Sequence, residues 1–207
     1  MTVTDVIRIS KNRYQIMIDG EFAFVLYKGE LSSYKVKKGE NISRESYNEI
    51  VEKVLTKRAK LRAMNLLTAK AYTEKQLLDK LKKGQYPLCC IEQAIQYVKS
   101  YGYIDDAQYA ADYLFYHGGE KNKRQLLLKL RQKGISDEIA EKAYEDYCQT
   151  GFAPNEEDLI CSYLNKKRFD PAGDEKEKNK MIRSLLQKGF SYGKIMASFA
   201  RYYKHSL

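Results

Sequence analysis

A repeat of about fifty residues constrains the fold of this chain more than any other feature of its sequence. Three stretches are variations on one another, at residues 76–86, 124–136 and 180–191. Each reads as a basic amphipathic helix that ends near a glycine and is followed by a second helix. The offsets between successive copies are 49 and 55 residues. A period of this length is typical of a modular helical array, in which each unit buries its apolar face on itself and its neighbours.

The apolar positions of the three copies coincide along both helices. The corresponding sets are Leu77, Leu126 and Met181; Leu81, Leu130 and Leu185; Ile91, Ala140 and Ile195; Ile95, Tyr144 and Phe199; Val98, Tyr147 and Tyr202. We therefore expect a mainly α-helical protein built from three tandem three-helix repeats in an elongated, curved array. Such arrays usually present an extended surface to a large partner.

The first 27 residues read differently, because apolar and polar residues alternate with the period of two that is typical of strands. Asp19-Gly20 supplies a tight turn between two of these runs. We expect a small three-stranded β-meander that packs on a helix, since so small a sheet is not stable alone. The residues expected on its apolar face are Val3, Ile7, Ile9, Tyr14, Ile16, Ile18, Phe22, Phe24 and Leu26.

Helix signals divide the remainder of the chain. Ser43 is an N-cap candidate for the first helix, and the apolar pattern resumes at Leu61, Met64, Leu67 and Ala71. Residues 170–180 read as a charged connector before the last two helices. The predicted domains are an N-terminal strand and helix domain at 1–57, then three-helix repeats at 58–104, 105–150 and 154–207.

The net charge of +10 is unevenly distributed. Residues 1–57, 58–106, 107–157 and 158–207 carry +2, +4, −2 and +6. A basic surplus indicates a polyanionic partner, either nucleic acid or an acidic protein surface. The negative third segment argues against one uniform basic stripe that follows the phosphates of a nucleic acid. The alternative is that the charged surface serves only to keep the protein soluble.

The sequence contains no recognisable catalytic set, phosphate-binding loop or metal-ligand spacing, so we expect no enzyme activity, no cofactor and no small-molecule substrate. The four cysteines form no C-x-x-C pair and only two histidines are present, which disfavours a zinc site. Buried free thiols in a reducing compartment are the favoured interpretation. No apolar run reaches membrane-spanning length, and we expect a cytoplasmic protein without a membrane partner.

Cations recur in the second helix of successive repeats, and we predict that they contact a partner. Cations near a helix C-terminus also favour the helix dipole, so local stabilisation is the alternative. The predicted partner-binding residues are Lys80, Lys82, Lys83, Lys121, Lys123, Arg124, Lys129, Arg131, Lys133, Lys166, Lys167, Arg168, Arg183 and Lys188. The tyrosines could stack on unpaired bases, but Tyr97, Tyr144, Tyr147 and Tyr202 stand at or beside apolar positions, which favours packing.

Two motif blocks resemble a known family. Gly102–Ala110, G-Y-I-D-D-A-Q-Y-A, resembles the G-Y-L-D-D-x-x-F-A signature of RecX, the bacterial regulator of the RecA recombinase. L-L-L-K-L-R-Q-K-G-I at 126–135 is similar to the E-L-x-x-K-L-x-x-K-G-I block of that family, with Gln125 in place of Glu. Residues 73–82 look like its S-x-x-E-L-x-x-K-L block. Two departures are Gly84, one position early in the first repeat, and Ser184 in place of the usual lysine.

The resemblance implies a non-enzymatic modulator that lies in the groove of the RecA filament on single-stranded DNA. In that family the protein mainly inhibits recombinase, ATPase and coprotease activity in DNA repair and the SOS response. We also expect weak direct contact with DNA. One alternative is a helical repeat protein that binds nucleic acid directly without RecA, and a second is a scaffold for some other acidic protein.

Overall fold

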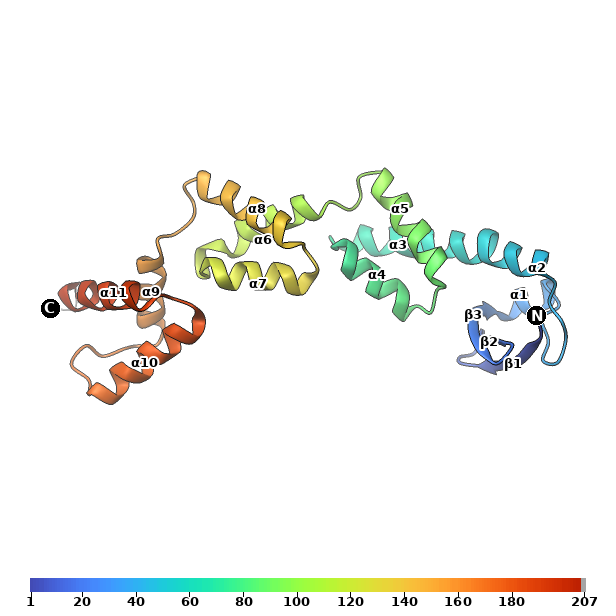
Figure 1. The fold of residues 1–207 in the computed structure, drawn as a ribbon, viewed down its shortest axis with the longest axis horizontal. Coiled ribbons are helices and arrows are strands. Elements are labelled where there is room, and N and C mark those ends of the chain that lie inside the picture. The colour runs from blue at the N-terminus through green and yellow to red at the C-terminus, as the bar shows by residue number, and fades with distance from the viewer. Residues whose placement is uncertain (206–207) are drawn as a thin grey trace. The chain divides into compact units, whose positions relative to one another are not determined.

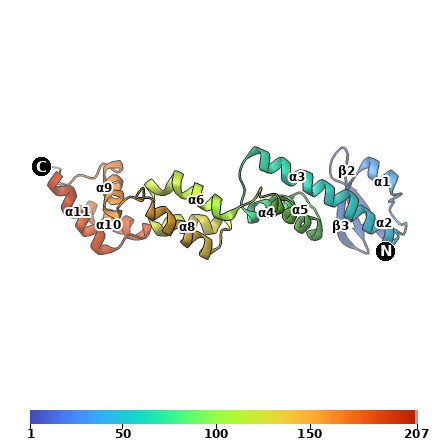
Figure 2. The same ribbon diagram turned by 90° about the horizontal axis from the view of Figure 1, so that it is seen from above.

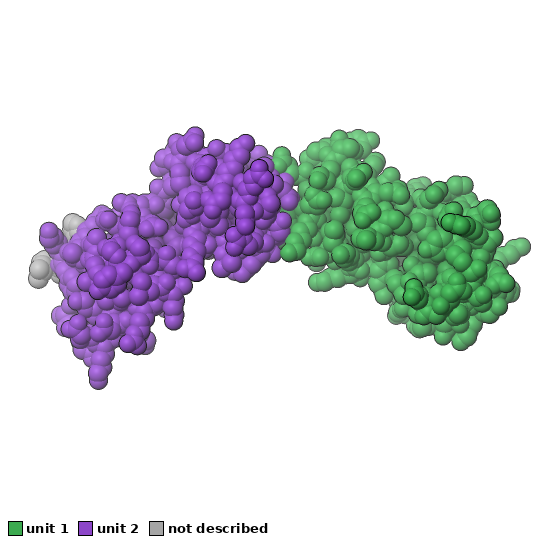
Figure 3. Space-filling view, viewed as in Figure 1, with its two compact units in different colours: residues 1–105 green, residues 106–207 purple. Residues whose placement is uncertain are grey.

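The computed structural model describes residues 1–205, which form a mainly helical protein with an N-terminal three-stranded antiparallel sheet. The chain divides into two compact units, Met1–Asp105 and Asp106–Leu207, coloured separately in Figure 3. The predicted fold class is confirmed in these terms. The division into four domains remains a prediction.

The sheet consists of β1 (Val3–Arg8), β2 (Arg13–Ile18) and β3 (Glu21–Tyr27), in the order β1-β2-β3. Its buried face carries Val3, Ile16, Ile18, Phe24 and Leu26. The prediction was wrong for Ile7, Ile9 and Phe22, which are 44%, 43% and 42% exposed. The pairing register shifts between Val3 and Asp5 and between Ile16 and Met17. Each extra residue reverses the alternation beyond it, and this turns the three side chains to the solvent.

One continuous helical stretch connects the sheet to the first helical group. It comprises α2 (Arg44–Glu49), a π-helical segment (Ile50–Leu55) and α3 (Thr56–Ala69). Ser43 caps it as predicted, with its hydroxyl accepting a hydrogen bond from the Ser46 backbone N–H at 3.1 Å. The prediction failed at Leu61, which is 53% exposed, and at Ala71, which lies beyond the helix end.

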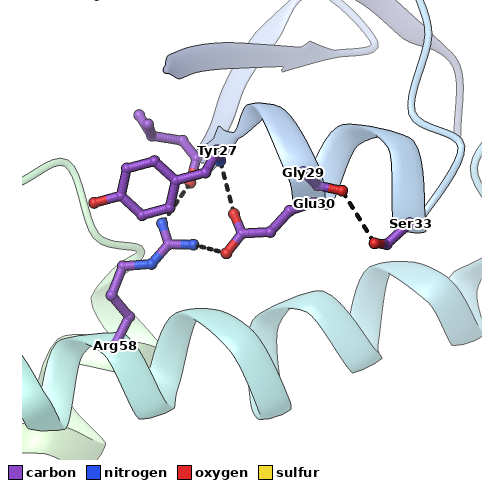
Figure 4. A network of polar contacts seen from close by, with 6 residues as sticks. Tyr27, Gly29, Glu30, Ser33 and Arg58 are labelled. Atoms are coloured by element: carbon purple, nitrogen blue, oxygen red, sulfur yellow. Dashed lines mark hydrogen bonds and ion pairs between the residues drawn. The ribbon is translucent and has the colours of Figure 1, made fainter. Parts of the chain in front are cut away.

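Arg58 of α3 fastens the strand region to this helix (Figure 4). Its guanidinium donates to the Val25 backbone oxygen at 3.2 Å, pairs with the Glu30 carboxylate, and lies 4.3 Å from the centroid of the Tyr27 ring. Glu30 belongs to α1 (Lys28–Ser33) and also accepts from the Tyr27 backbone N–H at 2.7 Å. One side chain thereby holds the end of β3 and the start of α1 against α3.

The first helical group is completed by α4 (Glu74–Lys83) and α5 (Leu88–Ser100). Buried side chains of the sheet, of the π-helical segment and of α3 to α5 form one hydrophobic core, and Tyr47 of α2 packs against it. Leu81 is fully buried in this core, at 0% exposure. The sheet is therefore not an independent module, and its apolar face is part of the core that holds the first three-helix group.

The second unit contains two helical groups (Figures 1 and 2), and buried side chains give each group its own hydrophobic core. The first consists of α6 (Asp106–His117), a short 3₁₀ turn (Gly118–Glu120), α7 (Lys123–Lys133) and α8 (Asp137–Gln149). The next consists of α9 (Glu156–Lys166), α10 (Glu175–Lys188) and α11 (Tyr192–His205). Leu130 and Leu185 are both 0% exposed, which confirms the predicted equivalence with Leu81.

The charged connector expected at 170–180 was only partly correct. Residues from Glu175 onward already belong to α10. The Asp174 carboxylate accepts from the Glu177 backbone N–H at 2.7 Å, and Glu175 and Glu177 lie in the first helical turn. Negative charges at this end complement the helix dipole, so a segment without apolar periodicity still begins a helix.

The turn after the second helix of each helical group has a left-handed residue, which is glycine in two groups and glutamine in the other. Gly134 and Gly189 end α7 and α10 in the left-handed conformation, at φ of 95° and 97°. In the first group Gln85 takes this role at φ of 61°, while Gly84 is right-handed at φ of −73°. A Cβ on Gly84 would lie 2.8 Å from the Tyr86 ring. The early glycine of the first repeat thus makes room for Tyr86, and a non-glycine residue bears the left-handed strain.

Candidate partner-binding site

Five of the predicted cations line one hollow in the second unit, with a volume of about 930 Å³. They come from three helices and one turn, and are Lys121, Lys129, Lys166, Lys167 and Lys188. Glu120 is the one acidic residue among the described residues that line the hollow. Uncharged lining residues include Gln125, Leu128, Ser162 and Tyr163. We call this feature the lysine hollow.

The ends of helices place these lysines. Lys166 and Lys167 stand at the C-terminus of α9, and Lys188 is the last residue of α10. Lys121 precedes the N-cap of α7, and Lys129 lies two turns further along that helix. Cations at helix C-termini are favoured by the dipole. Two of the three helices therefore stabilise their own contribution to the hollow.

Asn122 joins the two sides of the hollow. Its side-chain oxygen accepts from the Gln125 backbone N–H at 2.9 Å and so caps α7. Its amide nitrogen donates to the Lys188 backbone oxygen at 3.0 Å, at the end of α10. The side chain is only 2% exposed. This buried amide fixes the start of α7 relative to the end of α10, and with them Lys121 and Lys188.

Tyr163 of α9 also lines the hollow, although it is not among the residues predicted from the sequence to bind a partner. The Lys188 ammonium lies 4.8 Å from its ring centroid and the Lys167 ammonium 6.0 Å. Its hydroxyl shares a hydrogen bond with Ser184 at 2.9 Å. Tyr163 and Lys167 are four residues apart on one helix face, and this spacing was the available signal.

The hollow carries charge that no carboxylate of the described part of the chain neutralises by an ion pair. None of its five lysines forms an ion pair within residues 1–205, and the Lys129 ammonium donates to the neutral Gln132 side chain at 3.0 Å. Like charges gathered in a concave surface focus a positive potential. The hollow is therefore suited to an anionic group such as a phosphate or a carboxylate.

Three further predicted cations of α7 have local partners. Lys123 pairs with Glu141 at 2.7 Å, and Arg131 pairs with Asp137 at 2.7 Å. The Lys133 ammonium lies 5.2 Å from the Tyr113 ring centroid and 3.2 Å from the Tyr109 hydroxyl. For these residues the structure supports the alternative of local stabilisation.

The other predicted cations, Arg124, Arg168, Arg183 and the three lysines of α4, also lie outside the lysine hollow. Arg124 and Lys123 line a hollow of about 460 Å³ with Arg131 and Glu156. Arg183 lines another of about 460 Å³ with Lys176 and Lys180. Arg168 lines a smaller one of about 310 Å³. Lys80, Lys82 and Lys83 are exposed on α4 of the first unit.

We also searched residues 1–205 for groups that could bind a metal ion and for helices that could cross a membrane. Within residues 1–205 no three histidine, cysteine or acidic side chains are grouped so that they could hold a metal ion. None of the helices in this range has the length and apolarity that membrane crossing requires. Tyr147 is buried, and Tyr97, Tyr144 and Tyr202 are partly buried against the hydrophobic cores, so the packing interpretation of these tyrosines is confirmed.

Domain models and curated proteins similar to this chain were found by comparison. Residues 59–97 match the model of the RecX first three-helix domain, and residues 155–197 match that of the RecX third three-helix domain. The chain is 30% identical over 198 residues to the regulatory protein RecX of Caldanaerobacter subterraneus subsp. tengcongensis, covering 92% of this chain and 94% of the relative. It is 27% identical to the regulatory protein RecX of Clostridium acetobutylicum, with 89% and 87% covered.

Solved structures show the same similarity. The crystal structure of RecX from Lactobacillus salivarius is 26% identical, with a TM-score of 0.59, and the match covers 72% of this chain and 96% of that one. A second crystal structure of regulatory protein RecX is 23% identical, with a TM-score of 0.61, over 93% of this chain and 96% of that one. At this lower identity the likeness concerns the fold alone.

Proposed function

The chain belongs to the RecX family, and from this premise we propose that it is a non-enzymatic regulator that binds the RecA filament on single-stranded DNA. It contacts the filament through the lysine hollow and mainly inhibits recombinase, ATPase and coprotease activity. The lysine hollow is the observation that carries the proposal, because its five ammonium groups form no ion pair within residues 1–205 and so fit a polyanionic filament. The protein's overall charge of +10 supports the same class of partner.

Direct binding to nucleic acid is the second candidate, favoured by the same hollow. The two functions differ in what the site must recognise. A filament regulator recognises protein as well as phosphate, whereas a nucleic-acid module needs phosphates that a bound recombinase would cover. Salt weakens both kinds of complex and does not separate them.

The site is tested by reversing the charge of Lys121, Lys129 and Lys166 together to Glu. These side chains line the hollow and form no ion pair among the described residues. We expect the triple variant to need at least about tenfold more protein for half-inhibition of RecA ATPase on single-stranded DNA, equal to about 1.4 kcal/mol of binding free energy. Helicity and thermal midpoint are measured on the same preparations.

The matched control carries the same charge change at Lys11, Lys57 and Lys75, which are exposed in the first unit. It should inhibit like the wild type. Equal loss in both triples would mean that net charge, and not the hollow, determines inhibition.

The partner is tested by comparing binding to the assembled RecA filament and to bare single-stranded DNA at one salt concentration. We expect a filament preference of at least about tenfold. Equal or tighter binding to bare DNA would refute the filament proposal and favour the nucleic-acid module.

A further inference from the structure

A second concave surface of the second unit has the opposite character from the lysine hollow. It is a groove of about 800 Å³ between α6 and α8, the first and third helices of their group, which pack side by side (Figures 1 and 2). Its lining shares no residue with the lysine hollow. We call it the α6/α8 groove.

Two apolar stripes line this groove. Ala107, Ala111 and Phe115 contribute from α6, and Ile139, Ala143 and Tyr147 contribute from α8. Within each stripe the residues are four apart, so each forms a row along one helix face. Alanines occupy three of the six positions, and small side chains let a third backbone approach closely. Phe115 at one end is 65% exposed.

This shape corresponds to the groove that a third helix occupies when it packs across two others. Amphipathic helices bind such grooves through apolar residues at spacings of three and four. Phe115 is not part of the hydrophobic core of this group, and most of its side chain is accessible to solvent. An apolar residue of a docked helix could therefore pack on the Phe115 ring without displacing the core.

Acidic residues around the groove indicate which kind of helix would bind there. Asp112, Glu138 and Asp146 line it, and Lys142 is the one cation among the described lining residues. The surrounding segment 107–157 carries −2 in a chain of net charge +10. The segment also supplies Lys121 and Lys129 of the lysine hollow, but the carboxylates that line this groove do not line that hollow. A carboxylate rim around an apolar groove is complementary to a helix that bears cations beside its apolar face.

We propose that the α6/α8 groove docks an amphipathic, lysine- or arginine-bearing helix of a protein partner. The inference is independent of the proposed function, because it uses different residues and a partner surface of opposite charge. The protein then has two separate contacts in one unit, an anionic ligand at the lysine hollow and a cationic helix at the α6/α8 groove.

The probe is a designed peptide of about 18 residues, or five helical turns, with leucines along one face and lysines elsewhere. Its matched counterpart carries glutamate at every lysine position. Binding of each labelled peptide to the full chain is measured by fluorescence anisotropy. The protein's net charge of +10 alone favours the glutamate peptide. We expect the opposite, with the lysine peptide bound at least about tenfold more tightly.

Two variants locate the contact. Ala111→Arg fills the groove from an exposed position, where arginine suits a helix, and Phe115→Ala removes the exposed ring. Each substitution should weaken binding of the lysine peptide to the protein at least about tenfold. Tyr116→Ala is the control, because Tyr116 is 76% exposed beside Phe115 but does not line the groove. It should bind like the wild type, and circular dichroism verifies the fold of all three.

Three outcomes would overturn the proposal. One is equal or tighter binding of the glutamate peptide, and another is lysine-peptide binding that Ala111→Arg and Phe115→Ala leave unchanged. The third is sedimentation showing that the free protein self-associates and that Phe115→Ala abolishes this, since the occupant would then be a second copy of the chain.

Discussion

Asn122 offers the sharpest test of how the second unit is held together. The side chain makes two different contacts, one as cap of α7 and one to the Lys188 carbonyl at the end of α10. Loss of an asparagine cap costs about 1 kcal/mol. Leaving a hydrogen-bonded carbonyl unpaired in a shielded position costs a further 1–3 kcal/mol or so. Asn122→Ala should therefore lower the free energy of unfolding by about 2–4 kcal/mol.

Asn122→Asp separates the two contacts. A carboxylate keeps the oxygen that caps α7, and its charge suits a helix N-terminus, but it cannot donate to the Lys188 carbonyl. We expect this variant to lose about 1–2 kcal/mol, nearly all of it from the connection between the two helical groups. Protection of the α10 and α11 amides against hydrogen exchange should fall, while the first turn of α7 stays protected.

Ser136→Ala is the matched control for capping. Ser136 caps α8, its hydroxyl accepting from the Ile139 backbone N–H at 3.3 Å, and the residue is exposed. It should cost about 1 kcal/mol and leave α10 protected. Urea unfolding and hydrogen exchange on the three variants decide the matter. If Asn122→Ala costs no more than Ser136→Ala, the bond to Lys188 contributes nothing and our account of the hollow's assembly is wrong.

Three other predictions concern separate parts of the fold. Leu130→Ala should destabilise the protein by about 2–5 kcal/mol in urea unfolding, because the side chain is fully buried, and a loss below about 0.5 kcal/mol would contradict its place in the core. Gln85→Gly should raise the thermal midpoint, because the left-handed conformation costs a non-glycine residue about 1–2 kcal/mol, more than the roughly 0.4–1 kcal/mol by which glycine stabilises the unfolded chain, and a lower midpoint would contradict this balance. Burial raises the pKa of the Cys90 thiol to about 11, so at pH 8 a thiol reagent should modify exposed Cys89 quickly and Cys90 only on unfolding. Equal rates at the two cysteines would refute the burial of Cys90.

The helical repeat could be predicted because one physical requirement repeats at every copy. Leu81, Leu130 and Leu185 each face the interior of a helical group, and the 49- and 55-residue offsets align all three in the sequence. Apolar periodicity records burial directly. The strand positions failed at Ile7 and Ile9 because a bulge inserts one residue without changing the alternating sequence pattern.

The candidate site was less predictable, because a cation's role depends on its neighbours in space. Lys129 and Arg131 both belong to α7, yet one lines the lysine hollow and the other pairs with Asp137 across a turn. Sequence spacing cannot show that Lys121 and Lys166 meet, since they come from different helical groups. The α6/α8 groove could not be predicted either, because an alanine on a helix face does not mark that face as a docking surface.

The continuous helix from Arg44 to Ala69 has a consequence for the solubility of the first unit. An apolar helix face that no other element covers makes a protein prone to aggregation. Here the sheet shields the buried residues Ile50, Val51 and Leu55 of this helix by joining the same core. The N-terminal strands thus cover an apolar face of this helix. A protein shortened to begin after Ser43 would be expected to lose solubility before it loses helicity.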